Sequence, residues 1–172
     1  DNPILTAEAA AVVKQKGELA AAGKGFPNSQ DQCRAIAPPF WHAMTLGLEM
    51  LPLKNGDFVM ISDQNANTRH IRMNGTHPAN LKPTPKGDSI GHWEGDTLVI
   101  DTIGIKRGPF PMLDMYGTPF TDKLHVVERY RMVDYDAAKG AMDRNAKENS
   151  YAGTGWDFDR EYRGKVLQLQ FT

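Results

Sequence analysis

The sequence predicts a mainly β protein, an antiparallel sandwich or closed barrel with one N-terminal helix. From about Leu46 onward, short apolar or alternating segments are separated by Gly, Pro and Asn-Gly turn signals. No segment with a helical period lies between these candidate strands, which argues against a parallel α/β sheet. The length of 172 residues fits one domain, residues 1–172, with a single core.

Residues 6–23 are typical of an α-helix. Thr6 can cap the first turn, and Glu8 favours the positive end of the helix dipole. An Ala-rich body follows, and Gly23 marks the end. The apolar positions cover a broad face, so we expect this helix to pack on a sheet. The Pro-containing segment 25–39 is predicted to be a loop.

Residues 46–172 are expected to form the β-barrel. The segments 46–53 and 58–62 flank Asn55-Gly56, which is a strong hairpin signal. The other candidate strands are 68–74, 91–94, 97–103, 124–133, 140–148, 156–163 and 166–171. Two long Pro-containing segments, 75–88 and 104–122, are predicted loops, and loops of that length are often functional.

The composition excludes several classes of function. The 20 Lys and Arg residues are balanced by 21 Asp and Glu, for a net charge of -1, and no basic run occurs, so we expect no nucleic-acid partner. No apolar run approaches the roughly 20 residues of a membrane-spanning helix. The five histidines and Cys33 lack the spacing of a transition-metal site, and no Gly-x-Ser-x-Gly or phosphate-binding loop occurs. We therefore expect neither a metal nor a cofactor.

Strand alternation places two charged residues among core residues. Between residues 124 and 133, Glu128 lies in the middle of the more apolar face. Between residues 156 and 163, Arg160 lies on the aromatic face, which also carries Trp156, Phe158 and Tyr162. A buried unpaired charge costs several kcal/mol, so Glu128 and Arg160 either form a structural ion pair or line a wet cavity. The sequence leaves both readings open, together with a bulge that turns one of them outward.

The strand at 97–103 does not reveal which of its faces is internal. If Asp101 points inward, it joins Glu128 as a second carboxylate, and two nearby carboxylates would supply an acid and a base. If Asp101 points outward, it caps a turn or pairs with a surface cation.

A loop rich in polar residues leads into the strand that carries Glu128. Asp114, Tyr116 and Asp122 precede His125, and a His beside a carboxylate is a competent general base near neutral pH. For each residue alone the alternative is an ordinary structural role, such as an Asp that caps a turn or a Tyr that packs on the surface. The cluster as a whole is expected to form a rim or lid over the barrel.

Two blocks of the sequence resemble a known family. Residues 87–102 (GDSIGHWEGDTLVIDT), then Leu113-Asp114 and residues 121–131 (TDKLHVVERYR), are similar to a largely uncharacterised family of secreted bacterial proteins, lipocalin-like (calycin-like) small barrels. A later Trp-x-x-x-Arg-x-Tyr pattern matches Trp156, Arg160 and Tyr162. The resemblance covers residues 48–171 and implies a lipocalin-like barrel of about eight strands. This sequence departs from the family pattern in its loops, at Asp88, at Phe120 and at Ile105-Lys106-Arg107.

The resemblance also implies export to the periplasm or out of the cell. It implies a cysteine near the C-terminus that pairs with Cys33, the only cysteine present. The chain opens at Asp1 without Met, as a processed or engineered chain does, and its last residues alternate like a strand. We therefore expect native residues beyond Thr172, among them a partner for Cys33.

Taken together, these observations predict an exported small-barrel enzyme of the lyase, isomerase or cyclase type that performs acid–base chemistry on a hydrophobic or aromatic small molecule. Glu128 or Asp101 would accept the proton, and Arg160 would stabilise a developing anion. The residues expected to donate or relay protons are Tyr116, Tyr130, His125 and His42. The residues expected to contact substrate are Trp156, Phe158, Tyr130, Tyr162, His42, Trp93 and Asp114.

The main alternative is a non-catalytic binding or carrier protein, in which the inward charges orient ligand or hold the barrel. An interaction module that uses the sheet surface is disfavoured, because the core needs the apolar faces. A cavity that reaches Glu128 would favour the enzyme, and large side chains that seal Glu128 would favour a structural pair. The sequence leaves the oligomeric state open, a homo-oligomer included.

Overall fold

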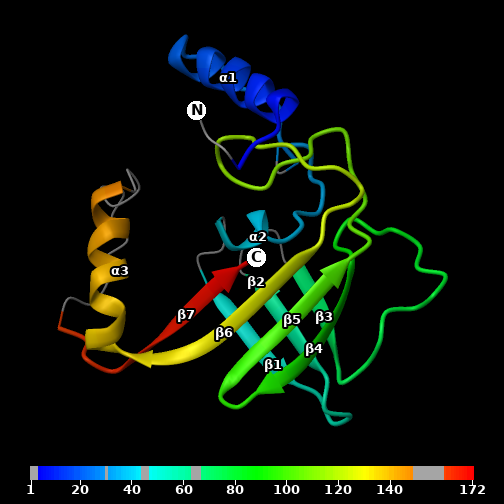
Figure 1. The fold of residues 1–172 in the computed structure, drawn as a ribbon, viewed down its shortest axis with the longest axis vertical. Helices are drawn as coiled ribbons and strands as arrows, with labels where there is room; N and C mark the ends of the chain where they lie inside the picture. Colours follow the sequence, from blue (N-terminus) through cyan, green and yellow to red (C-terminus); the bar gives the residue numbers. More distant parts are fainter. Residues whose placement is uncertain (1–3, 30, 44–46, 63–66, 149–160) are drawn as a thin grey trace.

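The computed structural model describes residues 4–29, 31–43, 47–62, 67–148 and 161–172. The fold is mainly β, with seven strands in one curled sheet that forms a half-barrel, and with an N-terminal helix (Figure 1). The strands are β1 (Leu48–Pro52), β2 (Phe58–Ser62), β3 (Asn67–Met73), β4 (Asp88–Glu94), β5 (Thr97–Ile103), β6 (Val126–Asp134) and β7 (Lys165–Phe171). The helices are α1 (Ala7–Ala21), α2 (Phe40–Ala43) and α3 (Tyr135–Glu148).

The sheet is mixed, which corrects the prediction of a fully antiparallel barrel of about eight strands. Its strands lie in sequence order, and every described neighbouring pair is antiparallel except β3 and β4. These two run parallel, with Ile71 opposite Ser89, because the long segment between them crosses back before β4 begins. The described strands β1 and β7 stand at opposite ends of this order and do not pair, so the curled sheet stays open.

The predicted strand at 140–148 is wrong, since this segment belongs to helix α3. Its sequence contains Ala, Lys, Met and Glu, which favour helix, and after Tyr135 it has no β-branched or aromatic residue. Asp136 lies in the first turn, and Lys139 pairs with Asp143 one turn later, 3.1 Å apart. Of the predicted strand at 156–163, residues 156–160 lie outside the described part of the chain, and residues 161–163 are not in a strand.

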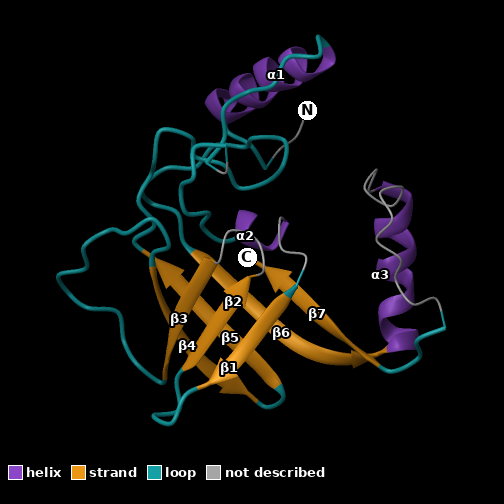
Figure 2. Cartoon of the chain, turned by 180° about the vertical axis from the view of Figure 1, so that it is seen from behind, coloured by secondary structure: helices purple, strands orange, loops and turns teal. Residues whose placement is uncertain are grey.

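Helix α1 forms where predicted, with the Thr6 hydroxyl accepting a hydrogen bond from the backbone of Ala9 (3.2 Å). It packs on loops rather than on the sheet, as Figures 1 and 2 show. The Lys16 ammonium donates to the carbonyl of Gly117 (2.9 Å), and no residue of α1 is buried. Its Ala-rich face offers too little apolar area to be held in the core. Among the described residues, no helix has the length and apolar character needed to span a membrane.

The core lies between the sheet and the short helix α2, which stands at the upper end of the half-barrel near the end of β7 (Figure 2). Phe40 and Trp41 of α2 are buried against side chains from the inner face of the sheet. We define the inner face by the buried side chains Met60, Ile71, Leu98, Ile100 and Tyr130. This packing places the next residue, His42, over β6.

Candidate functional site

A buried carboxylate lies at the centre of the inner face. Glu128 lies on β6 opposite Ile100 of β5, and its side chain is 0% exposed. The Arg69 guanidinium binds both carboxylate oxygens, with a 3.0 Å bond to Oε1 and a second, short contact to Oε2. Glu128 Oε1 also lies 2.7 Å from Nε2 of His42 and accepts a 2.9 Å hydrogen bond from the Tyr130 hydroxyl. We call Glu128, Arg69, His42 and Tyr130 the inner network.

The inner network keeps Glu128 ionised. Burial alone raises the pKa of Glu128, but the charge of Arg69 and the hydrogen bonds from His42 and Arg69 outweigh it and lower this pKa to about 2. A carboxylate with so low a pKa is a weak base near neutral pH. Burial and the negative charge of Glu128 raise the pKa of Tyr130, so its phenol stays protonated. These properties favour a structural role for Glu128 over the role of proton acceptor.

Sequence reasoning missed Arg69, which is the partner that Glu128 has in the structure. Arg69 is buried on β3. Its Nε donates a hydrogen bond to the hydroxyl of Ser89 (3.0 Å), and its Nη2 donates one to the hydroxyl of Thr102 (2.8 Å). Its guanidinium also lies 5.6 Å from the ring centre of Trp41. Strand alternation could have identified it, because alternation puts Arg69 on the same face of the strand as the apolar Ile71. The expected partner Arg160, together with Trp156 and Phe158, lies outside the described residues.

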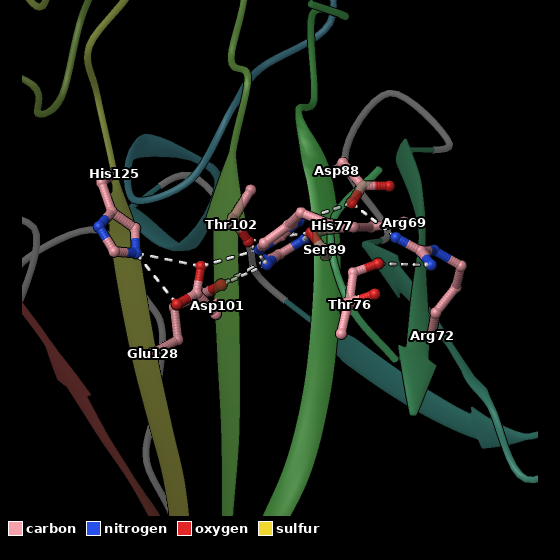
Figure 3. Close-up of polar contacts among 10 residues, drawn as sticks. All are labelled: Arg69, Arg72, Thr76, His77, Asp88, Ser89, Asp101, Thr102, His125 and Glu128. Atoms are coloured by element: carbon pink, nitrogen blue, oxygen red, sulfur yellow. Dashed lines mark hydrogen bonds and ion pairs between the residues drawn. The ribbon is translucent and has the colours of Figure 1, made fainter. Parts of the chain in front are cut away.

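Asp101 and Glu128 do not form a pair of carboxylates. Ile100 is the residue of β5 that faces Glu128, so its neighbour Asp101 projects from the opposite, outer face. There both Asp101 oxygens lie 3.0 Å from Nε2 of His125, and Oδ1 lies 3.1 Å from Nε2 of His77. Figure 3 draws the contacts of Asp101 with His125 and His77.

A second set of polar side chains thus spreads over the outer face. His77 Nδ1 lies 2.7 Å from Asp88, which also accepts a hydrogen bond from Arg72 (2.6 Å). His77 contacts a carboxylate at each ring nitrogen, and both bonds form when both nitrogens carry hydrogen. We call Asp101, His77, His125, Asp88 and Arg72 the outer network. It holds the loop after β3 against the sheet, and the described residues offer no group of three His, Cys, Asp or Glu side chains suited to a metal ion.

The remaining predicted site residues lie apart from both networks. The Asp114 carboxylate accepts hydrogen bonds from the backbone of Tyr116 (2.9 Å) and from the hydroxyl of Thr118 (2.6 Å), which is turn chemistry. Tyr116 itself is exposed. Trp93 is exposed and packs its ring edge-on against Phe58. The exposed Tyr162 donates to the backbone of Lys165 (2.8 Å), so these residues do not gather around one described cavity.

A cleft of about 450 Å³ lies between the loop residues 29 and 31–40 on one side and the loop segment 104–120 on the other, with Pro85 also in its lining. Its wall includes Phe40 of α2 and Phe120, and the Ser29 hydroxyl donates to the carbonyl of Phe110 (3.2 Å), which ties the two segments together. The apolar residues that line it are Ala35, Ile36, Ala37, Phe40, Pro85, Pro109, Phe110, Met112 and Phe120, with Arg34, Lys106 and Arg107 as the charged ones. We call this the loop cleft. Glu128 is not among its lining residues.

A smaller pocket of about 260 Å³ opens where β3 and β4 diverge below their short parallel pairing. Its lining includes Arg69 and Ser89, and the Lys86 ammonium, which also lines it, donates to the carbonyl of Thr68 (2.5 Å). Burial lowers the pKa of Lys86. The pocket is too small and too polar to receive the hydrophobic ligand expected from the sequence.

Comparison with models of known protein families, with curated proteins and with solved structures gave no match for this chain. The resemblance to lipocalin-like secreted barrels, and the export that it implies, therefore stay predictions. Cys33 is a free, exposed thiol in the structure.

Proposed function

We propose that the protein is a binding or carrier protein that takes up one hydrophobic or aromatic small molecule in the loop cleft. The volume and lining of that cleft carry the proposal. Small-molecule sites are concave, mostly apolar and about 300–1,000 Å³ in volume, with a few polar groups that fix the ligand's orientation. The loop cleft has about 450 Å³, an aromatic wall and only a few charged groups.

The contrast with the centre of the sheet supports this location. Glu128 has no exposed surface, and its described partners Arg69, His42 and Tyr130 are large side chains that surround its carboxylate. A ligand would have to break buried hydrogen bonds to reach it, and each buried polar group left unpaired costs about 1–3 kcal/mol. The inner network is thus better suited to hold α2 and the cleft wall than to bind the ligand.

The test uses N-phenyl-1-naphthylamine, a neutral aromatic probe whose fluorescence rises in apolar surroundings. Gly108 lines the cleft, and a Cβ added there meets no atom within 4 Å. We expect saturable binding of one probe per chain, and we expect Gly108→Phe to weaken it by filling the cleft mouth. Gly140→Phe on α3 is the matched control, since its Cβ also enters open space, and it should bind as the unmodified chain does. Binding that is absent, or unaffected by Gly108→Phe, would contradict the proposal.

Acid–base catalysis is the second candidate, and one contact favours it. A carboxylate bonded to one nitrogen of an imidazole orients the ring and stabilises its charged form, as in catalytic dyads. Glu128 and His42 have this relation, and His42 lies two residues after Phe40, which lines the cleft. The proton-transferring group would then be His42, with Glu128 as its positioning residue.

Conversion of a bound ligand distinguishes the two candidates. An aromatic ligand retained by the cleft is incubated with the protein and followed by mass spectrometry. If the protein is an enzyme, His42→Gln abolishes product formation while the ligand's dissociation constant stays the same. A ligand recovered unchanged from the unmodified protein supports the carrier function.

A further inference from the structure

The charged residues of the loop cleft are all of one sign. Arg34 comes from one loop segment, and Lys106 and Arg107 come from the other, so three cations line the same hollow. No described residue that lines it is acidic, although the whole chain has a net charge of -1. We propose that the ligand of the cleft is an anion, and that the protein selects small aromatic or hydrophobic carboxylates over their neutral analogues. This inference rests on the proposed function and names its ligand class.

The cleft cations differ from three of the four arginines on the described strands, the fourth being Arg131, which donates to the side chain of Gln168. Arg69, Arg72 and Arg129 each form an ion pair with a carboxylate, those of Glu128, Asp88 and Glu94. Within the described part of the chain, the side chains of Arg34, Lys106 and Arg107 form no such ion pair. Their charge is therefore available to a ligand without breaking an existing ion pair.

The backbone around these cations is held in place. The Asp122 carboxylate accepts a hydrogen bond from the backbone N–H of Arg107 (2.9 Å), and the backbone of Lys106 donates to Thr84 (2.8 Å). Asp122 brings one negative charge near the rim, which leaves an excess of positive charge there. On the other side, the backbone of Arg34 donates to the carbonyl of Ser29 (2.9 Å).

The chemistry of the cleft matches a carboxylate on an apolar body. A guanidinium presents paired N–H donors that match the two oxygens of a carboxylate, and an ammonium adds a point charge. Phe40, Phe110 and Phe120 offer the apolar wall for the rest of the molecule. The cations are solvent-exposed, so their attraction for the anion should be moderate and should weaken in high salt.

The experiment compares two probes that share one aromatic frame and differ by an anionic substituent. The anion 8-anilino-1-naphthalenesulfonate is N-phenyl-1-naphthylamine with a sulfonate added. We expect the full chain to bind the anion about tenfold more tightly than the neutral probe. In the variant Arg34→Gln/Lys106→Gln/Arg107→Gln this preference, taken as the ratio of the two affinities measured in that variant, should fall to about unity. A second pair, 2-naphthoate and 2-naphthamide in competition with the neutral probe, tests whether a carboxylate is favoured in the same way.

The control variant carries the same change of net charge away from the cleft. Lys54→Gln/Arg131→Gln/Lys165→Gln alters the β1–β2 turn, β6 and the start of β7, and it should keep the tenfold preference. Equal affinity of the unmodified chain for the two probes overturns the inference, and so does a preference that the cleft variant retains. If the neutral probe itself fails to bind one-to-one at the cleft, the proposed function fails first. The two failures are thus distinguishable.

Discussion

The two faces of one sheet carry two networks that contain the same kinds of groups in different surroundings. On the inner face, Glu128 is 0% exposed and Arg69 is 4% exposed. On the outer face, Asp101 is 31% exposed and His125 is 55% exposed. Both carboxylates accept hydrogen bonds from a histidine, and each network joins residues from at least two strands. The difference between them is access to water.

That difference decides what each network does for the protein. A buried charge that loses its partner keeps its full desolvation cost, whereas an exposed charge is solvated again by water. The inner network should therefore be essential for stability, and the outer network nearly dispensable. We therefore expect the burial of an ion pair, rather than the number of its hydrogen bonds, to set the loss of stability when the pair is broken.

The largest effect is expected when the inner ion pair loses its cation. Arg69→Met leaves the Glu128 carboxylate buried without its counter-charge, which should lower the free energy of unfolding by about 3–5 kcal/mol. Urea denaturation monitored by circular dichroism measures this loss. If Arg69→Met does not fold, Arg69→Lys is measured instead. It keeps the positive charge without the bidentate contact to Glu128 and should lower the free energy of unfolding by less.

Arg72→Met is the matched control on the outer face. Arg72 pairs with Asp88 at 2.6 Å, but its side chain is 35% exposed. We expect a loss of about 0–1 kcal/mol. Equal losses for Arg69→Met and Arg72→Met would contradict the argument from burial.

The next effect is the dependence of stability on acid. The pKa of Glu128 is lowered from 4.5 to about 2 in the folded protein. Between these pH values the unfolded chain therefore binds a proton at Glu128, whereas the folded chain does not. The stability from this group is complete above about pH 4.5 and is lost as the pH falls toward 2, with a slope that approaches about 1.4 kcal/mol per pH unit. Urea denaturation at a series of pH values measures this slope.

The double variant Arg69→Met/Glu128→Leu serves as the reference for that measurement. It replaces the ion pair by apolar side chains, which is often neutral for stability. Asp57 and Glu94 also have a lowered pKa, through hydrogen bonds to the backbone of Met73 and to Arg129 respectively, but both are kept in the double variant. The difference between the two proteins therefore isolates Glu128, and identical acid profiles would show that Glu128 is not held ionised.

Local signals predicted much of the sheet but not its topology. The Asn55-Gly56 turn and the alternation at 58–62 and 97–103 gave the strand bounds that the structure has. The parallel pairing of β3 and β4 depends on the path of the long loop between them. The hydrophobic periodicity of the strands gives no information about that path. Helix α3 was missed because residues 140–148 were assigned to a strand, although their Ala, Lys, Met and Glu residues favour helix.

The position of a site residue was predictable where it depends on alternation within one strand. It was not predictable where residues from several elements must come together. Alternation alone placed Glu128 on the core face of β6, and the structure confirms that position. Its partners Arg69 and His42 come from β3 and α2, 59 and 86 residues away in the chain, so only the fold brings them together. The loop cleft is likewise formed by two loop segments, whose residues showed no common period.

A smaller effect is expected for Tyr130→Phe, which removes one donor from the inner network. Arg69 and His42 still bind Glu128 Oε1 after the change, and the aromatic ring is kept. The Tyr130 hydroxyl also lies 2.8 Å from Nε2 of His42, so the change removes up to two hydrogen bonds, and the free energy of unfolding should fall by about 1–2 kcal/mol. A loss as large as that of Arg69→Met would show that the three donors act as one unit, which a double-mutant cycle with His42→Gln would then measure.

The smallest effect is expected for His125→Ala on the outer face. His125 is more than half exposed, and Asp101 keeps its contact with His77 when the His125 ring is removed. Because water can replace the lost donor, the change in the free energy of unfolding should stay within about 0.5 kcal/mol. A loss of several kcal/mol would mean that the outer network is shielded from water in solution, and the proposed difference in water access between the two faces would then be wrong. Measured beside Tyr130→Phe under the same conditions, this variant gives the change in the free energy of unfolding for an exposed hydrogen bond, with which the change for the buried one is compared.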